Sequence, residues 1–291
     1  MFDRIVVVDW SASSTPRRGR DSIWICEHAV ADASVRSVNP PTRAAAVDVL
    51  AELAAGSDRV LVGIDISLGY PAGTAAALGL EGTPWRAMWE VLRAELHDGD
   101  DNANDRFAVA SELNGRISAG PGPFWGCPPS QRTPTLTSTK VPSEPLAEWR
   151  TVEAQMRDDG RRPFSCWQLL GNGAVASQSL VGIVALARLR DRLAAVGREA
   201  RLWPLETGLR APTDPVVVAE VWPSLLPPAI EVPGGAVRVR DHAQVETQAA
   251  HLADAVRTGE VSAMFDPGVS AARAVVEGEE GWVLGVRAAD R

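Results

Sequence analysis

The sequence predicts an α/β protein in which helices cover both faces of a mixed central sheet. Two observations lead to this prediction. The chain opens with three short β-like segments, and strongly apolar strand segments farther along the chain alternate with amphipathic helices. Strands that are apolar on both faces are typical of the buried middle of a sheet. We therefore expect the core order β-β-β-α-β-α-β-α, with a large insertion after the fourth strand.

The first half of this core reads as a meander followed by a helix and a buried strand. Thr42 is suited to cap the helix, and Gly56 is suited to end it. The strands are rich in β-branched residues, which favour extended backbone. The expected elements are strands at 4–9, 23–27 and 34–38, a helix at 43–55 and a strand at 59–66.

The second half contains the insertion and the end of the core. Residues 70–165 include a long stretch rich in Pro, Gly, Ser and Thr, and we expect them to form a helical and loop insertion that covers the site. With this insertion, residues 1–291 are expected to form a single domain. The other expected elements are helices beginning at 84 and spanning 175–196 and 242–257, strands at 200–204 and 216–222, and a final edge strand at 282–286.

Composition narrows the class of protein. The net charge of −8 argues against a protein that coats nucleic acid non-specifically, because such binding depends on a basic surface. The sequence contains no apolar run of membrane-spanning length and no recognisable signal peptide. Three widely separated cysteines predict neither a disulfide framework nor a zinc site. We expect a soluble cytoplasmic protein, of an oligomeric state that composition leaves open.

The clearest functional signal is an acidic residue on each of three apolar strands: Asp9, Asp65 and Glu220. A carboxylate on a buried strand is costly unless it is paired, hydrogen-bonded or bound to metal. Each acid lies in the C-terminal half of its strand, where open α/β sheets bind their ligands. Asp241, near the start of the last helix, is the first candidate for a fourth carboxylate, and Asp254 is the reserve.

Such a cluster of carboxylates repels itself and is stable mainly when Mg²⁺ or Mn²⁺ neutralises it. We therefore predict that Asp9, Asp65, Glu220 and Asp241 are metal ligands and catalytic residues. Two such ions about 3.5–4 Å apart can activate water and stabilise the leaving oxygen of a phosphodiester. The alternative is that one or more of these acids caps a turn or helix, or pairs with an arginine.

A polar loop after the first strand supplies candidates for phosphate binding. Ser11 could place its hydroxyl group near a phosphate, and Arg17, Arg18 and Arg20 could bind phosphate oxygens. The same residues are also common in ordinary solvated turns, so both interpretations remain open.

The insertion and the following helix add further candidates for substrate binding. Arg106 could bind phosphate, and Phe124 and Trp125 belong to a Pro-Phe-Trp-Gly stretch that could stack on a base or fill a hydrophobic core. Gln178 could reach the site from the start of its helix, or it could remain a surface residue.

Three short motifs follow one another along the chain: Val-Val-Val-Asp9-Trp-Ser, Gly63-Ile-Asp65-Ile-Ser-Leu-Gly-Tyr-Pro71 and Ala-Glu220-Val-Trp-Pro223-Ser. Together with Arg106 and with Phe124 and Pro128, they resemble an uncharacterised bacterial and archaeal family described as predicted RNase-H-like nucleases. The resemblance covers about residues 4–257 and implies an RNase-H-like fold with a nuclease site. The sequence departs from the family where a proline usually follows the second acid, and the choice between Asp241 and Asp254 stays open.

Three functions are compatible with these features. The first is a divalent-metal-dependent nuclease or phosphodiesterase acting on nucleic acid or on a small phosphodiester, and we favour it. The second is a non-catalytic protein that binds a ligand or partner on the same scaffold. The third is an actin-like or sugar-kinase-type ATP-dependent phosphotransferase, whose first phosphate loop resembles Asp9-Trp-Ser-Ala-Ser-Ser but whose second, glycine-rich motif we do not find in the sequence.

Overall fold

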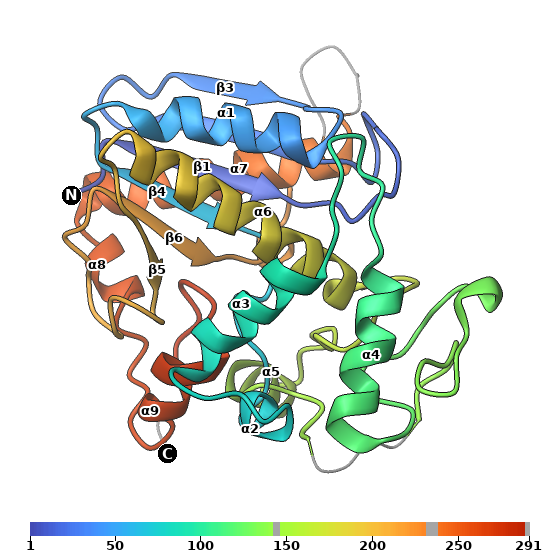
Figure 1. Cartoon of the computed structure of the whole chain (residues 1–291). Helices are drawn as coiled ribbons and strands as arrows, with labels where there is room; N and C mark the ends of the chain where they lie inside the picture. Colours follow the sequence, from blue (N-terminus) through green and yellow to red (C-terminus); the bar gives the residue numbers. More distant parts are fainter. Residues whose placement is uncertain (142–145, 231–237, 289–291) are drawn as a thin grey trace.

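The computed structural model describes residues 1–141, 146–230 and 238–288. Its core is a six-stranded mixed sheet with the strand order β3-β2-β1-β4-β6-β5 (Figure 1). The first three strands form an antiparallel meander, and the other three run parallel to β1. The predicted α/β class with a mixed sheet is therefore confirmed. The strands are β1 (Arg4–Asp9), β2 (Trp24–Ala29), β3 (Val35–Val38), β4 (Val60–Ile64), β5 (Ala200–Trp203) and β6 (Val216–Glu220).

Three long helices cover the two faces of the sheet (Figure 1). Helices α1 (Arg43–Ala55) and α6 (Val175–Ala195) lie on one face, and α7 (Arg240–Thr258) lies on the other. The strand side chains alternate accordingly: Val6 and Val8 pack with α1 and α6, whereas Ile5 and Val7 pack with α7. Two strands, β5 and β6, lie between α6 and α7 at the positions expected for the strands at 200–204 and 216–222, so the core has one strand more than the order β-β-β-α-β-α-β-α.

The helix caps follow from the local sequence. Thr42 Oγ1 accepts a hydrogen bond from the backbone N–H of Ala45 at 3.2 Å, which confirms the predicted cap of α1. Pro84 occupies the first turn of α3, where its missing N–H costs nothing. Helix α7 begins at Arg240, so Asp241 lies in its first turn rather than before it.

In the described part of the segment between β4 and α6, four helices lie below the sheet in the view of Figure 1. It corresponds to the expected insertion, although α4 and α5 were not anticipated within its loop-rich sequence. Its elements are α2 (Thr74–Ala77), α3 (Pro84–Glu95), α4 (Arg106–Ser118), a 3₁₀ turn at Pro129–Gln131 and α5 (Thr151–Asp158).

The C-terminal part of the described chain packs as turns rather than as a strand. The expected edge strand at 282–286 is wrong: only Val283 forms a bridge, to Glu220, and the N–H of Val286 then bonds back to the carbonyl of Val283 at 3.1 Å. This turn takes the chain away from the sheet after one residue. The short elements of this half are a 3₁₀ turn at Pro223–Leu225, α8 (Val261–Met264), α9 (Arg273–Val275) and a π-helical turn at Val276–Glu280.

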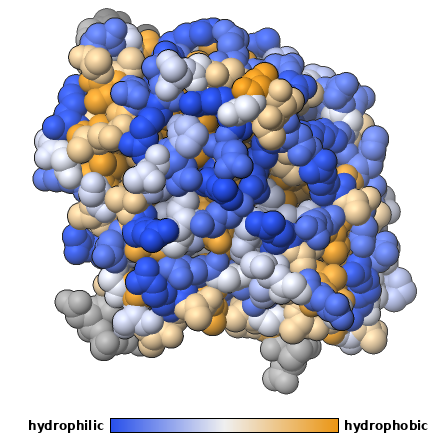
Figure 2. All heavy atoms as spheres, turned by 60° about the vertical axis from the view of Figure 1, so that its left-hand side comes forward, coloured by the Kyte–Doolittle hydropathy of each residue, from blue (hydrophilic) through white to orange (hydrophobic). Residues whose placement is uncertain are grey.

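The face shown in Figure 2 is predominantly hydrophilic, with hydrophobic side chains in small groups. Within the described ranges, no helix combines the length and the apolar character needed to cross a membrane.

Candidate functional site

A cavity of about 1080 Å³ opens where β1 and β4 end. Its walls come from the loop after β1, the start of the loop after β4, residues 161–178 leading into α6, and residues 222–225 together with the first turn of α7. The carboxyl ends of parallel strands are the usual place for a ligand in an open α/β sheet. The cavity is therefore the first place to look for function.

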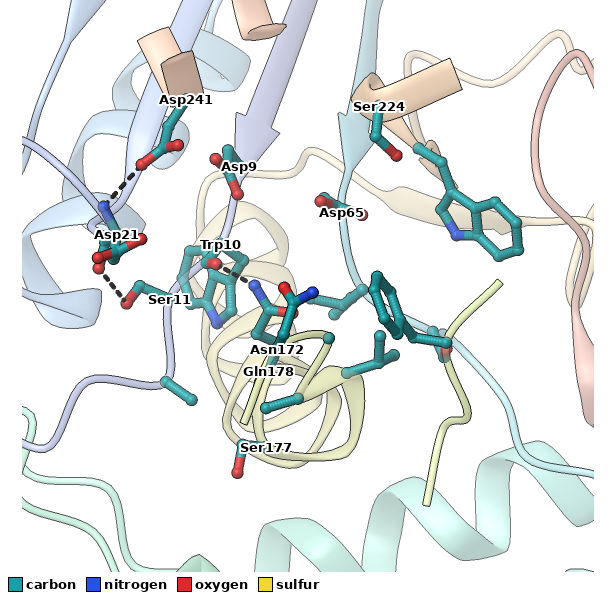
Figure 3. A pocket seen from close by; sticks show the side chains of 18 of the residues that line it. Asp9, Trp10, Ser11, Asp21, Asp65, Asn172, Ser177, Gln178, Ser224 and Asp241 are labelled. Atoms are coloured by element: carbon teal, nitrogen blue, oxygen red, sulfur yellow. Dashed lines mark hydrogen bonds between the residues drawn. The ribbon is translucent and has the colours of Figure 1, made fainter. Parts of the chain in front are cut away.

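Asp9 and Asp65 lie next to each other in this cavity (Figure 3). The parallel strands β1 and β4 pair Val8 with Ile64, so the next residues along the two strands are Asp9 and Asp65. Neighbouring strands are about 4.8 Å apart, and residues in parallel register project from the same face. The strand pairing therefore places the two carboxylates side by side.

Asp9 and Asp65 have no neutralising partner among the described residues. No described side chain donates a hydrogen bond to either one or forms an ion pair with it. Burial raises the pKa of Asp9 well above its usual value, and the charges of Asp65, Asp241 and Asp21 raise it further. Burial and then the charge of Glu220 raise the pKa of Asp65 to about 7. Without a cation, the pair therefore tends to hold a proton near neutral pH.

Glu220 belongs to a different part of the structure. β4 and β6 pair Ile64 with Glu220, so the residue alongside Asp65 is Val221. This offset of one residue turns the Glu220 side chain toward the opposite face of the sheet. There it is fully buried and accepts hydrogen bonds from both terminal nitrogens of Arg150, at 2.7 and 2.8 Å. The structure thus brings Glu220 to an arginine and not into the cavity.

Of the two candidates for a fourth carboxylate, only Asp241 lines the cavity. It lies on the side of Asp9 away from Asp65 in Figure 3, and its Oδ2 accepts a hydrogen bond from the N–H of Asp21 at 2.7 Å. It lies in the first turn of α7, where the free N–H groups of a helix interact favourably with an acidic side chain. Asp254 is exposed on the same helix and pairs with Arg257 at 2.9 Å.

Two of the predicted substrate-binding residues hold the loop after β1 in place. Gln178 Nε2 donates to the carbonyl oxygen of Trp10 at 2.6 Å and so ties α6 to this loop (Figure 3). Ser11 Oγ donates to the carbonyl oxygen of Asp21 at 3.2 Å. The predicted substrate-binding residues that line the cavity are Ser11, Arg17, Arg106 and Gln178.

The other predicted substrate-binding residues lie outside the cavity lining. Arg18 donates a hydrogen bond to the carbonyl oxygen of Asn39. Phe124 is fully buried, with its ring centroid 4.9 Å from that of Trp167, and Trp125 pairs its backbone with the same residue. For Phe124 the structure therefore shows the alternative of a hydrophobic core residue.

Arg106 is a buried cation with neutral partners. Its guanidinium donates to Ser177 Oγ and Ser14 Oγ, both at 2.9 Å, and to Asn104 Oδ1 at 2.7 Å. Burial and the nearby charge of Arg43 lower the pKa of Arg106 to about 10, so the group is still charged at neutral pH. No carboxylate of the described chain forms an ion pair with it. A buried guanidinium that lines a cavity and is not ion-paired with a carboxylate is well suited to bind an anion.

Several residues that line the cavity were not among the site residues predicted from the sequence. Arg161 and Arg162 come from the loop after α5, and Phe164 follows them closely. A pair of arginines between Gly160 and Pro163 resembles any exposed loop, so the sequence carries no signal for their location. The arginines that line the cavity are Arg17, Arg20, Arg106, Arg161, Arg162 and Arg240. Of these six, Arg17 alone forms an ion pair with a carboxylate in the parts of the chain that are described, at 3.3 Å from Asp21.

The pair of Asp9 and Asp65 can be compared with the ligand sets that proteins use to bind metal ions. The described residues contain no group of three or more His, Cys, Asp or Glu side chains arranged to hold a metal. Mg²⁺, however, is usually bound by one or two carboxylates, with water and substrate phosphate completing its shell. Asp9 and Asp65 fit this pattern, since both are partly buried, adjacent and unpaired within the described residues.

The fold and the site together define an α/β protein with an acidic pair in an arginine-lined cavity. Comparison of the chain with models of protein families, with curated proteins and with solved structures gave no match. Function is therefore argued from the chemistry of the site.

Proposed function

We propose that the protein is a divalent-cation-dependent phosphodiester hydrolase, or nuclease, of RNase-H-like architecture. The observation that carries the proposal is the unpaired carboxylate pair of Asp9 and Asp65 in a cavity whose wall also holds the buried cation Arg106. Such a pair suits a divalent cation such as Mg²⁺ or Mn²⁺, and the arginine suits a phosphate. The sheet order, with an antiparallel meander joined to parallel strands, and the motif resemblance support the architecture.

The roles of the residues follow from their chemistry. A divalent cation held by Asp9 and Asp65 would supply Lewis acidity, which activates water and stabilises charge that develops on phosphoryl oxygens. Arg106 would bind a phosphate oxygen through charge-assisted hydrogen bonds. Gln178 would keep the loop that follows Asp9 in position through its bond to Trp10.

Asp241 would act on the cation through charge. Its carboxylate interacts unfavourably with that of Asp9 and so raises the pKa of Asp9 when no cation is present. The same negative charge would attract a cation to the pair. Its hydrogen bond from Asp21 fixes the carboxylate at the edge of the cavity.

The proposal is tested by hydrolysis of bis(p-nitrophenyl) phosphate with Mn²⁺. The wild type is expected to release p-nitrophenolate. Asp9→Asn is expected to abolish the reaction, because one carboxylate of the pair is lost. Arg106→Met is expected to lower kcat/KM about tenfold or more, since a hydrogen bond to a charged group contributes about 1.5–3 kcal/mol. Asp254→Asn changes an exposed acid outside the cavity and serves as the matched control.

Two outcomes separate the hydrolase from the alternatives. If the wild type cleaves the ester and Asp9→Asn does so equally well, the reaction does not use the acidic pair. If the wild type binds Mn²⁺ but cleaves no phosphodiester, the catalytic part of the proposal is wrong and the cavity is a site for ligand binding.

A further inference from the structure

Phe164 presents an aromatic side chain to the cavity. The residue is 46% exposed, although it lines a cavity otherwise rich in charged and polar groups. Leu170, which is 44% exposed, lines the same cavity. Exposed hydrophobic side chains that gather at one cavity mark a binding surface more often than isolated ones do.

Gly173 fixes the position of this ring. A Cβ atom built on Gly173 would lie 2.0–2.5 Å from three atoms of the Phe164 ring, so the ring packs directly against the main chain there. Gly173 has a φ of 76°, which also favours glycine. One side of the ring is thus held by the loop that leads into α6, while nearly half of the residue stays exposed.

A second aromatic side chain of the lining is also held in place. The Nε1 of Trp222 donates a hydrogen bond to Glu220 Oε1 at 2.9 Å, and Glu220 is in turn fixed by Arg150. The ion pair of Arg150 and Glu220 therefore orients Trp222, which lines the cavity, although Arg150 and Glu220 do not line it themselves.

We infer that the substrate is a small nucleotide-like phosphodiester whose flat ring stacks on Phe164 while its phosphate is bound by Arg106. This inference rests on the proposed function, because it places the ligand in the same cavity. Base stacking on an aromatic side chain is favourable and tolerates different bases. Arg161 and Arg162 lie in the same loop as the ring and carry charge of the sign that a phosphate requires.

The size and charge of the protein favour a small ligand. Cavities for small molecules measure about 300–1,000 Å³, and this one, at about 1080 Å³, is comparable with the upper end of that range. Binding of a long duplex depends on an extended basic surface, whereas this chain has a net charge of −8. A molecule with one or two bases therefore fits better than a duplex.

The inference is tested by comparing adenosine 5′-monophosphate with ribose 5-phosphate, which has the same phosphate but no base. Calorimetry is done on the wild type, Phe164→Ala, Phe164→Tyr and Val196→Ala, with and without Mn²⁺. The wild type is expected to bind the nucleotide at least about fivefold more tightly than the sugar phosphate. Phe164→Ala is expected to remove this ratio by weakening the nucleotide alone. Phe164→Tyr is expected to retain it, and so is the control Val196→Ala, which shortens an exposed hydrophobic side chain outside the cavity.

Equal affinities in the wild type, binding of neither compound, or a ratio that survives Phe164→Ala would overturn the inference. These outcomes are distinct from failure of the proposed function. If the ratio is absent but Mn²⁺ still binds at Asp9 and Asp65, only the stacking inference falls. If the ratio is present but no Mn²⁺ binds, the hydrolase proposal falls and the nucleotide site remains.

Discussion

Asp9 and Asp65 oppose the stability of the fold when they are ionised. Burial raises the pKa of Asp65 from its usual 3.8 to about 7, and the pKa of Asp9 is also raised. Between pH 3.8 and about pH 7, Asp65 has lost its proton in the unfolded chain but still binds it in the folded chain. Stability is therefore greatest below about pH 3.8, as far as this group is concerned, and falls as the pH rises toward 7. This cost is typical of a functional site.

Asp65→Asn is accordingly expected to stabilise the protein in the absence of divalent cations. The gain should be small at pH 4 and about 1–3 kcal/mol at pH 8, a range reduced from the full pKa shift because the carboxylate faces the cavity. Urea unfolding at the two pH values measures it. Asp254→Asn, at an exposed site, should change the unfolding free energy by less than about 0.5 kcal/mol. A destabilised Asp65→Asn at pH 8 would show that the carboxylate has a favourable partner.

At the scale of single residues, the sequence located the acidic pair but not its surroundings. Asp9 and Asp65 could be singled out because charged side chains on apolar strands are costly. Arg150 could not, because an arginine beside Trp149 in a loop-rich segment looks like a surface residue. Its burial depends on Glu220, which is 70 residues away in the chain, as well as on the nearby Glu153.

At the scale of elements, strand pairing decides which acids meet. The sequence places an acid near the end of three strands, but hydrogen bonding between strands sets their register. Asp9 and Asp65 are in register, whereas Glu220 is one position short and faces the other side of the sheet. Long apolar strands and periodic helices were predicted closely. The prediction of an edge strand at 282–286 was wrong because the apolar residues of this segment are buried in a turn.

The buried ion pair of Arg150 and Glu220 stabilises the contact between two elements of the fold. Arg150 is fully buried and joins α5 to β6 through Glu153 and Glu220. Arg150→Ala is expected to lower the free energy of unfolding by about 3–5 kcal/mol, because it leaves two buried carboxylates without a cation. Arg257→Ala, which breaks an exposed pair, should cost about 1 kcal/mol or less. Equal costs for the two variants in urea unfolding would contradict this interpretation.

At the scale of the whole molecule, the cavity is assembled from segments far apart in the chain. The sheet and its helices bring together residues from the β1 loop, the β4 loop, the region 161–178 and the start of α7. The general position of the site, at the carboxyl ends of the parallel strands, could be predicted from the strand pattern. The contribution of Phe164, Arg161 and Arg162 could not, because nothing periodic in their loop indicates where it packs.

The central claim is that Asp9 and Asp65 together hold a divalent cation. Anomalous diffraction from crystals containing Mn²⁺, measured at the manganese absorption edge, tests it most directly. The account predicts an anomalous peak between the two carboxylates in the wild type and its loss in Asp9→Asn. A wild-type crystal with no peak at this position, or a peak that persists unchanged in Asp9→Asn, would contradict the account.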